Sequence, residues 1–342
     1  MHALCERARL ATLIVSLVLA AAACGGTGGH DDGVAAKTGP RVSGLAASVR
    51  ARISVGSYPE SIVTGFGSVW VTKRDGGITE IDPAANRPVR RIADASFYAR
   101  SIVAGAGSLW AVDVTSETTA RLERVDPRSG AVEASLPVDF SHQNPVQLLF
   151  ADAYVWLMNG NDGNLYKIDP RTNAVEDRVK VATRSSVVSV AFAGGSVWTG
   201  SLEGPVTRVD PRAMDVVGRV SGLTAVRLAG DDVHLWAAEL GGGLARVDTE
   251  TTRVARRVDV GSGEEFRLAV VGSTLWARSD TTLYARDART GAVRRTDRIP
   301  RARMVFGMTA GFGSLWLVRG TLGQVWRLPL RASADRRRAT VG

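Results

Sequence analysis

Hydrophobic and polar residues alternate with a period of two along most of the chain, in short segments separated by turn-forming residues. Between residues 61 and 95, "SIVTG" predicts a strand, "FGS" a tight turn and "VWVT" a second strand, and "ITEID" and "PVRRIADA" continue as a third and a fourth. Because a strand places successive side chains on opposite faces, this alternation indicates half-buried sheets. No segment has a convincing helical period, so we expect an all-β fold.

This four-stranded unit recurs seven times. Each copy carries a short motif such as "GSVW" or "GSLW" that ends in tryptophan, and the tryptophans follow one another at intervals of 40, 46, 42, 38, 40 and 40 residues. Four strands in every 40 or so residues are typical of a propeller blade. We therefore predict a seven-bladed β-propeller of four-stranded blades with the tryptophans packed between blades. These tryptophans are Trp70, Trp110, Trp156, Trp198, Trp236, Trp276 and Trp316.

A second repeated feature is an aspartate at the end of the third strand of the first six units. Asp-Pro followed by Asn or Gly is turn chemistry, because aspartate bonds forward to the backbone and Asn or Gly accepts a left-handed conformation. Met214 and Thr252 depart from this pattern at the left-handed place. The aspartates are Asp82, Asp126, Asp169, Asp210, Asp248 and Asp287, and the matching residues are Asn86, Gly130, Asn173 and Gly291.

The two ends of the repeat region complement each other. The seventh unit supplies three strands and ends near residue 330, and the segment "VRARISVG" at 49–56 offers a fourth. An N-terminal strand that completes the last blade would close the ring and remove open sheet edges. We expect the propeller to span residues 47–330 and to be followed by a basic tail at 331–342.

The N-terminus predicts export. Arg7 and Arg9 precede an apolar run of 14 residues, which is too short for a comfortable membrane span and ends in small residues. Residues 1–23 are therefore predicted to be a signal peptide. Cys24 follows three alanines and resembles the lipobox cysteine of bacterial lipoproteins, although that motif prefers Leu at the place of Ala21. The resemblance implies a lipid on Cys24, a flexible tether at 24–46 and a location on the outer surface of the cell membrane; plain secretion is the alternative.

Cysteine content and charge limit the remaining choices. The mature chain would keep one cysteine, so it cannot form an internal disulfide or a cysteine-based zinc site. The net charge of +9 is carried mostly by arginine. It indicates either a solvated basic surface or attraction to a polyanion. An envelope location argues against nucleic acid, and we expect a monomer.

The innermost strands can be located relative to each tryptophan. The residue eight places before each tryptophan is large and apolar and should lie in the core. The residues seven and nine places before should then face the central channel. The seven-before set is Val63, Val103, Leu149, Ala191, Ala229, Ala269 and Thr309, and the nine-before set is Ser61, Ser101, Gln147, Ser189, Arg227, Arg267 and Gly307.

Arg227 and Arg267 are the strongest candidates for a binding site. They occupy equivalent places in neighbouring units, and a guanidinium binds carboxylate or phosphate through a bidentate fork. Glu264 or Glu265 in the preceding loop is the alternative partner. We predict a ligand site at this channel mouth that comprises Arg227, Arg267, Gln147, Ser61, Ser101, Ser189, His142 and Tyr98. Other loop residues expected on this face are Tyr58, Glu60, Phe97, Arg100, Gln143, Asn144 and Arg303.

The units "GSVWVT…ITEIDP" and "GSLWAVD…LERVDPRSGAV" resemble the YVTN/YncE-like and streptogramin-lyase-like (virginiamycin B lyase) propellers of bacteria. The lyase resemblance implies a Mg-dependent elimination that uses Glu and His at the channel. Glu203 and Glu239 stand near the matching positions, but no His accompanies either, so the likeness is to the scaffold.

Two functions remain for the channel, beside loose, salt-sensitive binding of a polyanion through the arginine surface. The first is a noncatalytic envelope scaffold without a cofactor that binds an anionic small molecule, a glycan or an envelope protein at the channel mouth. The second is a propeller lyase or hydrolase, which predicts a Mg or Ca site near Glu203, Glu239, Glu264 or Glu265.

Overall fold

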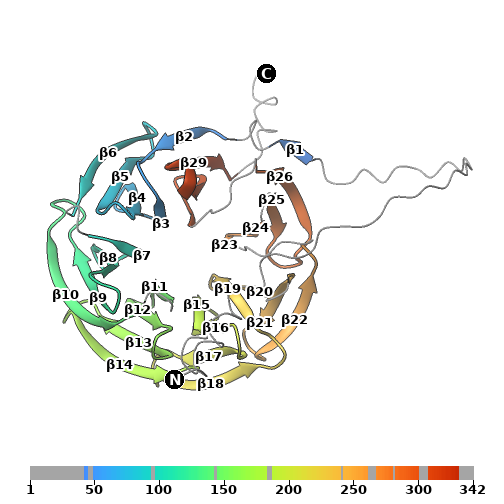
Figure 1. The fold of residues 1–342 in the computed structure, drawn as a ribbon. Coiled ribbons are helices and arrows are strands. Elements are labelled where there is room, and N and C mark those ends of the chain that lie inside the picture. Colours follow the sequence, from blue (N-terminus) through green and yellow to red (C-terminus); the bar gives the residue numbers. More distant parts are fainter. Residues whose placement is uncertain are drawn as a thin grey trace, which may run out of the picture. The chain divides into compact units, whose positions relative to one another are not determined.

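In the computed structural model, seven antiparallel sheets follow one another around a ring (Figure 1). This confirms the predicted all-β, seven-bladed propeller, and a single 3₁₀ turn at Gly320–Leu322 is the only helical element of the described part of the chain. Residues 1–41, with Cys24, and the tail at 331–342 lie outside that part. The structure describes residues 42–44, 49–93, 97–141, 145–182, 187–239, 242–260, 267–279, 282–299 and 307–330.

Each blade runs from an innermost strand beside the channel to an outermost strand at the circumference, in chain order. Blade 1 comprises β3 (Pro59–Gly65), β4 (Ser68–Lys73), β5 (Ile78–Asp82) and β6 (Arg87–Ile92); blade 2 comprises β7 (Ala99–Gly105), β8 (Ser108–Val114), β9 (Thr119–Val125) and β10 (Val132–Asp139); blade 3 comprises β11 (Val146–Ala151), β12 (Tyr154–Asn159), β13 (Asn164–Asp169) and β14 (Ala174–Lys180); blade 4 comprises β15 (Val187–Ala193), β16 (Ser196–Ser201), β17 (Val206–Asp210) and β18 (Asp215–Val220). Blade 5 comprises β19 (Ala225–Gly230), β20 (Leu235–Glu239), β21 (Leu244–Asp248) and β22 (Arg253–Val258); blade 6 comprises β23 (Arg267–Val271), β24 (Thr274–Ser279), β25 (Thr282–Asp287) and β26 (Val293–Arg298); blade 7 comprises β27 (Met308–Gly311), β28 (Ser314–Arg319) and β29 (Gln324–Pro329).

Blade 7 takes its outermost strand from the other end of the chain. β2 (Ala51–Ser54) pairs antiparallel with β29, and the amide of Val55 donates to the carbonyl of Gly323 at 2.9 Å. Ile53 is buried there against blade 1. A further strand, β1 (Val42–Gly44), lies within the segment expected to be a tether and pairs in parallel with β26.

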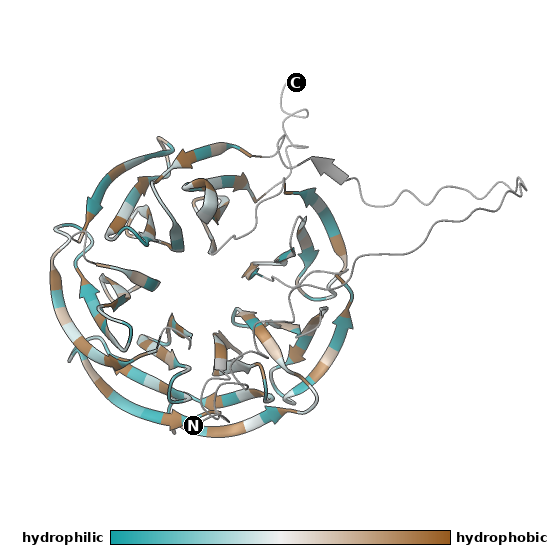
Figure 2. Ribbon diagram, viewed as in Figure 1, coloured by the Kyte–Doolittle hydropathy of each residue, from teal (hydrophilic) through white to brown (hydrophobic). Residues whose placement is uncertain are grey.

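The core lies between neighbouring blades. All seven repeat tryptophans are at most 1% exposed. Trp110 of blade 2, for example, packs with Leu148 and Leu157 of blade 3. Hydrophobic and hydrophilic residues alternate along the outer strands (Figure 2). A sheet that buries both faces against neighbours needs apolar residues on both faces of its second strand, which explains why the second strands β4, β8, β16 and β28 show little alternation in burial.

The aspartate turns form as predicted. The carboxylate of Asp82 accepts the amides of Ala84 and Ala85, and the amide of Asn86 closes the turn on the carbonyl of Asp82 at 2.9 Å. Met214 and Thr252, which lack the expected residue type, adopt the same left-handed conformation, with φ of 53° and 56°. The closed turn therefore imposes the left-handed backbone conformation on these residues. A non-glycine residue in this conformation carries a strain of about 1 kcal/mol.

An arginine on the third strand joins each of several blades to the next. Arg124 lies opposite Trp110 in the sheet, with its guanidinium carbon 5.5 Å from the ring centre, and Nη1 donates to the carbonyl of Pro170 in the blade 3 turn at 2.8 Å. Arg208 makes the equivalent contacts with Trp198 and the blade 5 turn. In blade 1 that position holds Glu80, and Arg90 from β6 reaches the blade 2 turn instead. We call this contact the arginine clamp.

The clamp also crosses the junction between blades 7 and 1. Arg327 lies 4.9 Å from the ring centre of Trp316, donates to the carbonyl of Pro83, and donates to Oδ1 of Asn86 at 2.8 Å. Its Nε donates to Ser314 Oγ at 2.7 Å, and the residue is 6% exposed. These contacts join residues more than 240 positions apart in the sequence.

We expect Arg327→Ala to lower the free energy of unfolding by about 2–4 kcal/mol, because the change removes a buried guanidinium together with its hydrogen bonds to partly buried acceptors of blades 1 and 7. Urea denaturation followed by tryptophan fluorescence measures this. Arg253→Ala, at an exposed arginine on β22, is the control and should change stability by less than about 0.5 kcal/mol. Equal losses in both variants would contradict a role for the clamp.

The stability of the fold should decrease at acidic pH because the carboxylates of the turn aspartates become protonated. Hydrogen bonds from backbone amides lower the pKa of Asp82, Asp126 and Asp210, and for Asp287 the bonds from Thr290 lower the pKa to about 2. A carboxylate whose pKa is lower in the folded state stabilises the fold above pH 4, and the stabilisation is lost as the pH falls toward 2. We expect Asp287→Asn to lower the melting temperature at pH 7 more than at pH 2.5. A difference that stays constant with pH would contradict this.

Candidate functional site: the entry end of the channel

The seven innermost strands form a continuous wall around the central channel. Each contacts the next, and β27 of blade 7 contacts β3 of blade 1. All seven run in the same direction through the ring, so the channel has an entry end, where they begin, and an exit end, where they turn into the second strands. A cavity lies at each end.

The entry cavity has a volume of about 250 Å³. Five of the predicted site residues line it, from blades 1, 2, 3, 5 and 6, together with Glu60, Arg100 and Gly307. These five are Ser61, Ser101, Gln147, Arg227 and Arg267. Residues up to 206 positions apart in the sequence thus meet at one opening.

The other predicted site residues are not among the described residues that line the entry cavity. Ser189 is 2% exposed, and its hydroxyl accepts the amide of Leu228 at 2.9 Å, so it joins blade 4 to blade 5. Tyr98 is half-buried and donates to Glu60 Oε1 at 3.4 Å. His142 lies outside the described residues, as do Glu264 and Glu265, the alternative partners of the arginines. Phe97, expected in a loop, is buried in the core between blades 1 and 2.

Three arginines bring positive charge to the entry cavity. Arg227 Nη1 donates to the carbonyls of Val226 at 2.7 Å and Val188 at 3.3 Å, which orients its guanidinium along the wall. Arg100, on β7, lies with its guanidinium carbon 5.8 Å from the ring centre of Phe140. Arg267 opens β23 and is paired across the sheet with Arg278.

Glu60 is the one carboxylate among the described lining residues of this cavity, and it pairs with an arginine. It is 8% exposed and accepts a hydrogen bond from Arg74 Nε as well as the one from Tyr98. The bond with Glu60 raises the pKa of Arg74, and burial, followed by the charge of Glu60, raises the pKa of Tyr98. Arg74 and Glu60 therefore balance each other.

Sequence reasoning placed Arg100 and Glu60 only among loop residues and did not identify Arg74. Arg100 stands ten places before Trp110, where a β-bulge between Ala99 and Ser101 shifts the register. A bulge turns a side chain out of the regular alternation. That irregularity has no clear signal in the sequence.

The exit cavity is larger, at about 700 Å³. It is lined by the predicted channel-facing residues Leu149, Ala191, Ala229, Ala269 and Thr309, and by Phe150 and Phe192. At its rim stand Asp152, Asp231 and Asp232. The two ends of the channel thus differ in the sign of their charged residues.

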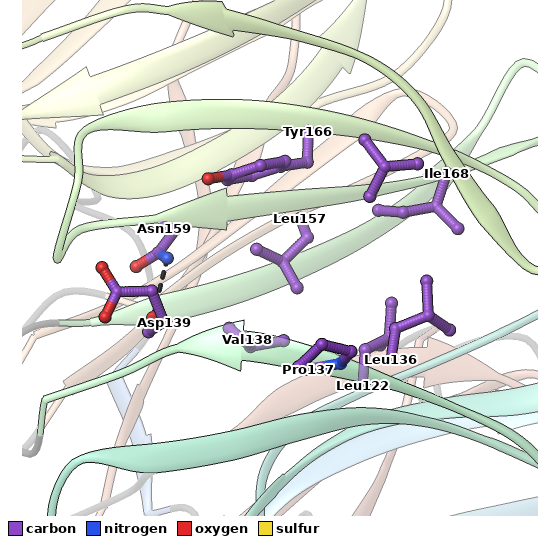
Figure 3. A pocket seen from close by; sticks show the side chains of 10 residues that line it. Leu122, Leu136, Pro137, Val138, Asp139, Leu157, Asn159, Tyr166 and Ile168 are labelled. Atoms are coloured by element: carbon purple, nitrogen blue, oxygen red, sulfur yellow. Dashed lines mark hydrogen bonds between the residues drawn. The ribbon is translucent and has the colours of Figure 1, made fainter.

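Three further cavities lie between blades, away from the channel. The crevice between blades 2 and 3 is lined by Leu122, Leu157 and Tyr166 (Figure 3) and, at about 70 Å³, has room for only a few waters. Glu203 lines a cavity of about 420 Å³ with Lys180 and Arg219. The third, of about 660 Å³, lies between blades 1 and 2.

The two glutamates that the lyase resemblance identifies do not lie together in one site. Glu239 is bonded to Arg257 Nε at 2.9 Å, and Glu203 lies in the separate cavity on blade 4. Within the ranges that the structure describes, no group of three His, Cys, Asp or Glu side chains is placed to hold a metal ion. Across the same ranges, no helix is long and apolar enough to span a membrane.

The fold defines this chain as a β-propeller. No protein-family model matches its sequence, and no curated protein is detectably similar to it. BamB from Moraxella catarrhalis is similar in structure, with a TM-score of 0.61 at 11% identity over 80% of this chain and 86% of that one. The computationally designed protein Ika8 has a TM-score of 0.59 at 15% identity over 81% and 99%. At these identities the likeness shows the fold alone.

Proposed function

We propose that this protein is a noncatalytic scaffold of the cell envelope that binds an anionic group at the entry end of its channel. The observation that carries the proposal is the convergence of Arg100, Arg227 and Arg267, from three blades, on one cavity in which the one carboxylate among the described lining residues is bonded to Arg74. Charge of one sign in a concave, low-dielectric opening attracts ligands of the opposite sign.

The size of the cavity limits which ligands it can hold. At about 250 Å³ it is smaller than the roughly 300–1,000 Å³ of sites for drug-sized ligands. It suits one carboxylate or phosphate group, either free or at the end of a larger molecule such as an acidic sugar. Gln147 and Ser61 add neutral polar groups beside the arginines.

Titration calorimetry with citrate and with inorganic phosphate tests the site. We expect Arg267→Gln and Arg227→Gln each to weaken binding by about 10- to 100-fold, because a hydrogen bond to a charged group is worth about 1.5–3 kcal/mol. Arg253→Gln, on the outer strand β22, is the matched control and should bind like the unmodified chain.

Binding that neither site variant weakens, or that the control weakens equally, would contradict the proposed site. Stabilisation by Mg or Ca that both arginine variants retain would favour the lyase reading instead. Thermal unfolding of each variant in the absence of ligand separates a loss of binding from a loss of fold.

The proposed location rests on the N-terminal pattern, which lies outside the described residues. A lipid on Cys24 would hold the propeller at the membrane surface, and lipid attachment needs the thiol. We expect Cys24→Ser to move the protein from the membrane fraction to the soluble exported fraction and to remove the acyl mass from the mature chain. Membrane fractionation with intact-mass spectrometry measures both. An unchanged fraction and mass would contradict lipidation.

A further inference from the structure

The exit cavity has no role in the proposed function, yet it is the largest cavity of the channel. Most of its lining residues are apolar in type, although polar and apolar atoms contribute about equally to its exposed surface, and two partly buried phenylalanines, Phe150 and Phe192, line it from adjacent blades. An open cavity of about 700 Å³ with apolar side chains in its lining lies within the size range of sites that bind organic ligands or side chains.

The charge around this cavity has one sign. The turns that join the first and second strands of the seven blades lie at this end of the channel, and they contain three aspartates, which line the cavity, and no lysine or arginine. Asp231 is engaged, since its carboxylate accepts the amides of Val233 and His234 and contacts the His234 ring. Asp152 and Asp232 are exposed on blades 3 and 5. The exit end therefore favours a cation.

The chain itself carries a cationic segment directly after blade 7. The described part of blade 7 ends at Leu330, whose amide donates to the carbonyl of Gly313 at 3.3 Å, in the rim turn of that blade. β29 is two strands away from β27, which lines the cavity, so Leu330 lies about 10 Å from the inner strand. The chain thus leaves the propeller at the exit end.

The residues that follow fit the cavity in charge and reach. The segment 331–342 contains Arg331 and the run Arg336, Arg337 and Arg338, with Asp335 as its only acid. Six extended residues cover about 20 Å, which is enough to carry the run from Leu330 over the rim.

We propose that the segment 331–342 docks its arginines into the exit cavity. The guanidiniums bond to the carboxylates of Asp152 and Asp232, and the apolar stems and planar heads pack on Phe150 and Phe192. The docked segment covers the apolar wall of the channel and leaves the entry end open to its anionic ligand.

A labelled peptide of residues 331–342 tests this on the full chain. In the variant Arg336→Ala/Arg337→Ala/Arg338→Ala the segment 331–342 has lost its arginine run, so it can no longer compete with the peptide for the cavity. We expect the peptide to bind this variant, as measured by fluorescence anisotropy at low salt, and to bind the unmodified chain at least fivefold more weakly because the resident segment competes. Raised salt should weaken binding, since exposed charges are screened.

Two further variants locate the site. Adding Asp152→Asn and Asp232→Asn to the triple variant should weaken peptide binding at least fivefold. Adding Asp177→Asn and Asp215→Asn, at exposed aspartates on the outer strands of blades 3 and 4, should leave it unchanged.

Each remaining outcome overturns the proposal. Equal binding to the triple variant and the unmodified chain would show that the resident segment does not occupy the cavity and that a separate basic partner does. Insensitivity to the rim aspartates would place the peptide elsewhere. Absence of binding to every chain would exclude docking.

Discussion

The contact between each blade and the next is the constraint on which the rest of this structure depends. A four-stranded sheet cannot bury two apolar faces by itself, so every blade needs a neighbour on each side. The repeat tryptophans contribute much of the area buried between blades. The arginine clamp joins the third strand of one blade to the turn of the next by hydrogen bonds. At the junction of blades 7 and 1 the same arginine position joins the two ends of the described chain, since Arg327 reaches Asn86.

A closed ring held in this way brings side chains from distant parts of the sequence together at the two ends of its channel. The entry end gathers arginines from three blades, and the exit end carries aspartates without a basic residue in the rim turns. The described lining residues of the two cavities therefore differ in the sign of their charged side chains.

The structural neighbours illustrate how little residue identity this architecture requires. BamB from Moraxella catarrhalis and a designed propeller share the fold at 11% and 15% identity. The alternation of strand residues, the turn chemistry and a large side chain between blades specify the fold, and many sequences satisfy them. Because the same scaffold hosts different sites, the chemistry at each channel end has to be established from its own residues.

Local chemistry in the sequence determined the number of blades, the strands of each blade and the aspartate turns, because alternation and turn preference act over a few residues. It also identified Arg227, Arg267, Gln147 and two serines at one end of the channel, since equivalent places in a repeat occupy equivalent places in a ring. Tertiary structure alone decided that Arg100 joins them through a bulge, that Ser189 holds two blades together, that Glu60 is bonded to Arg74, and that aspartates gather at the far end. Those outcomes depend on contacts between blades distant in sequence, and the free energy of such contacts is set by packing geometry that no local pattern records.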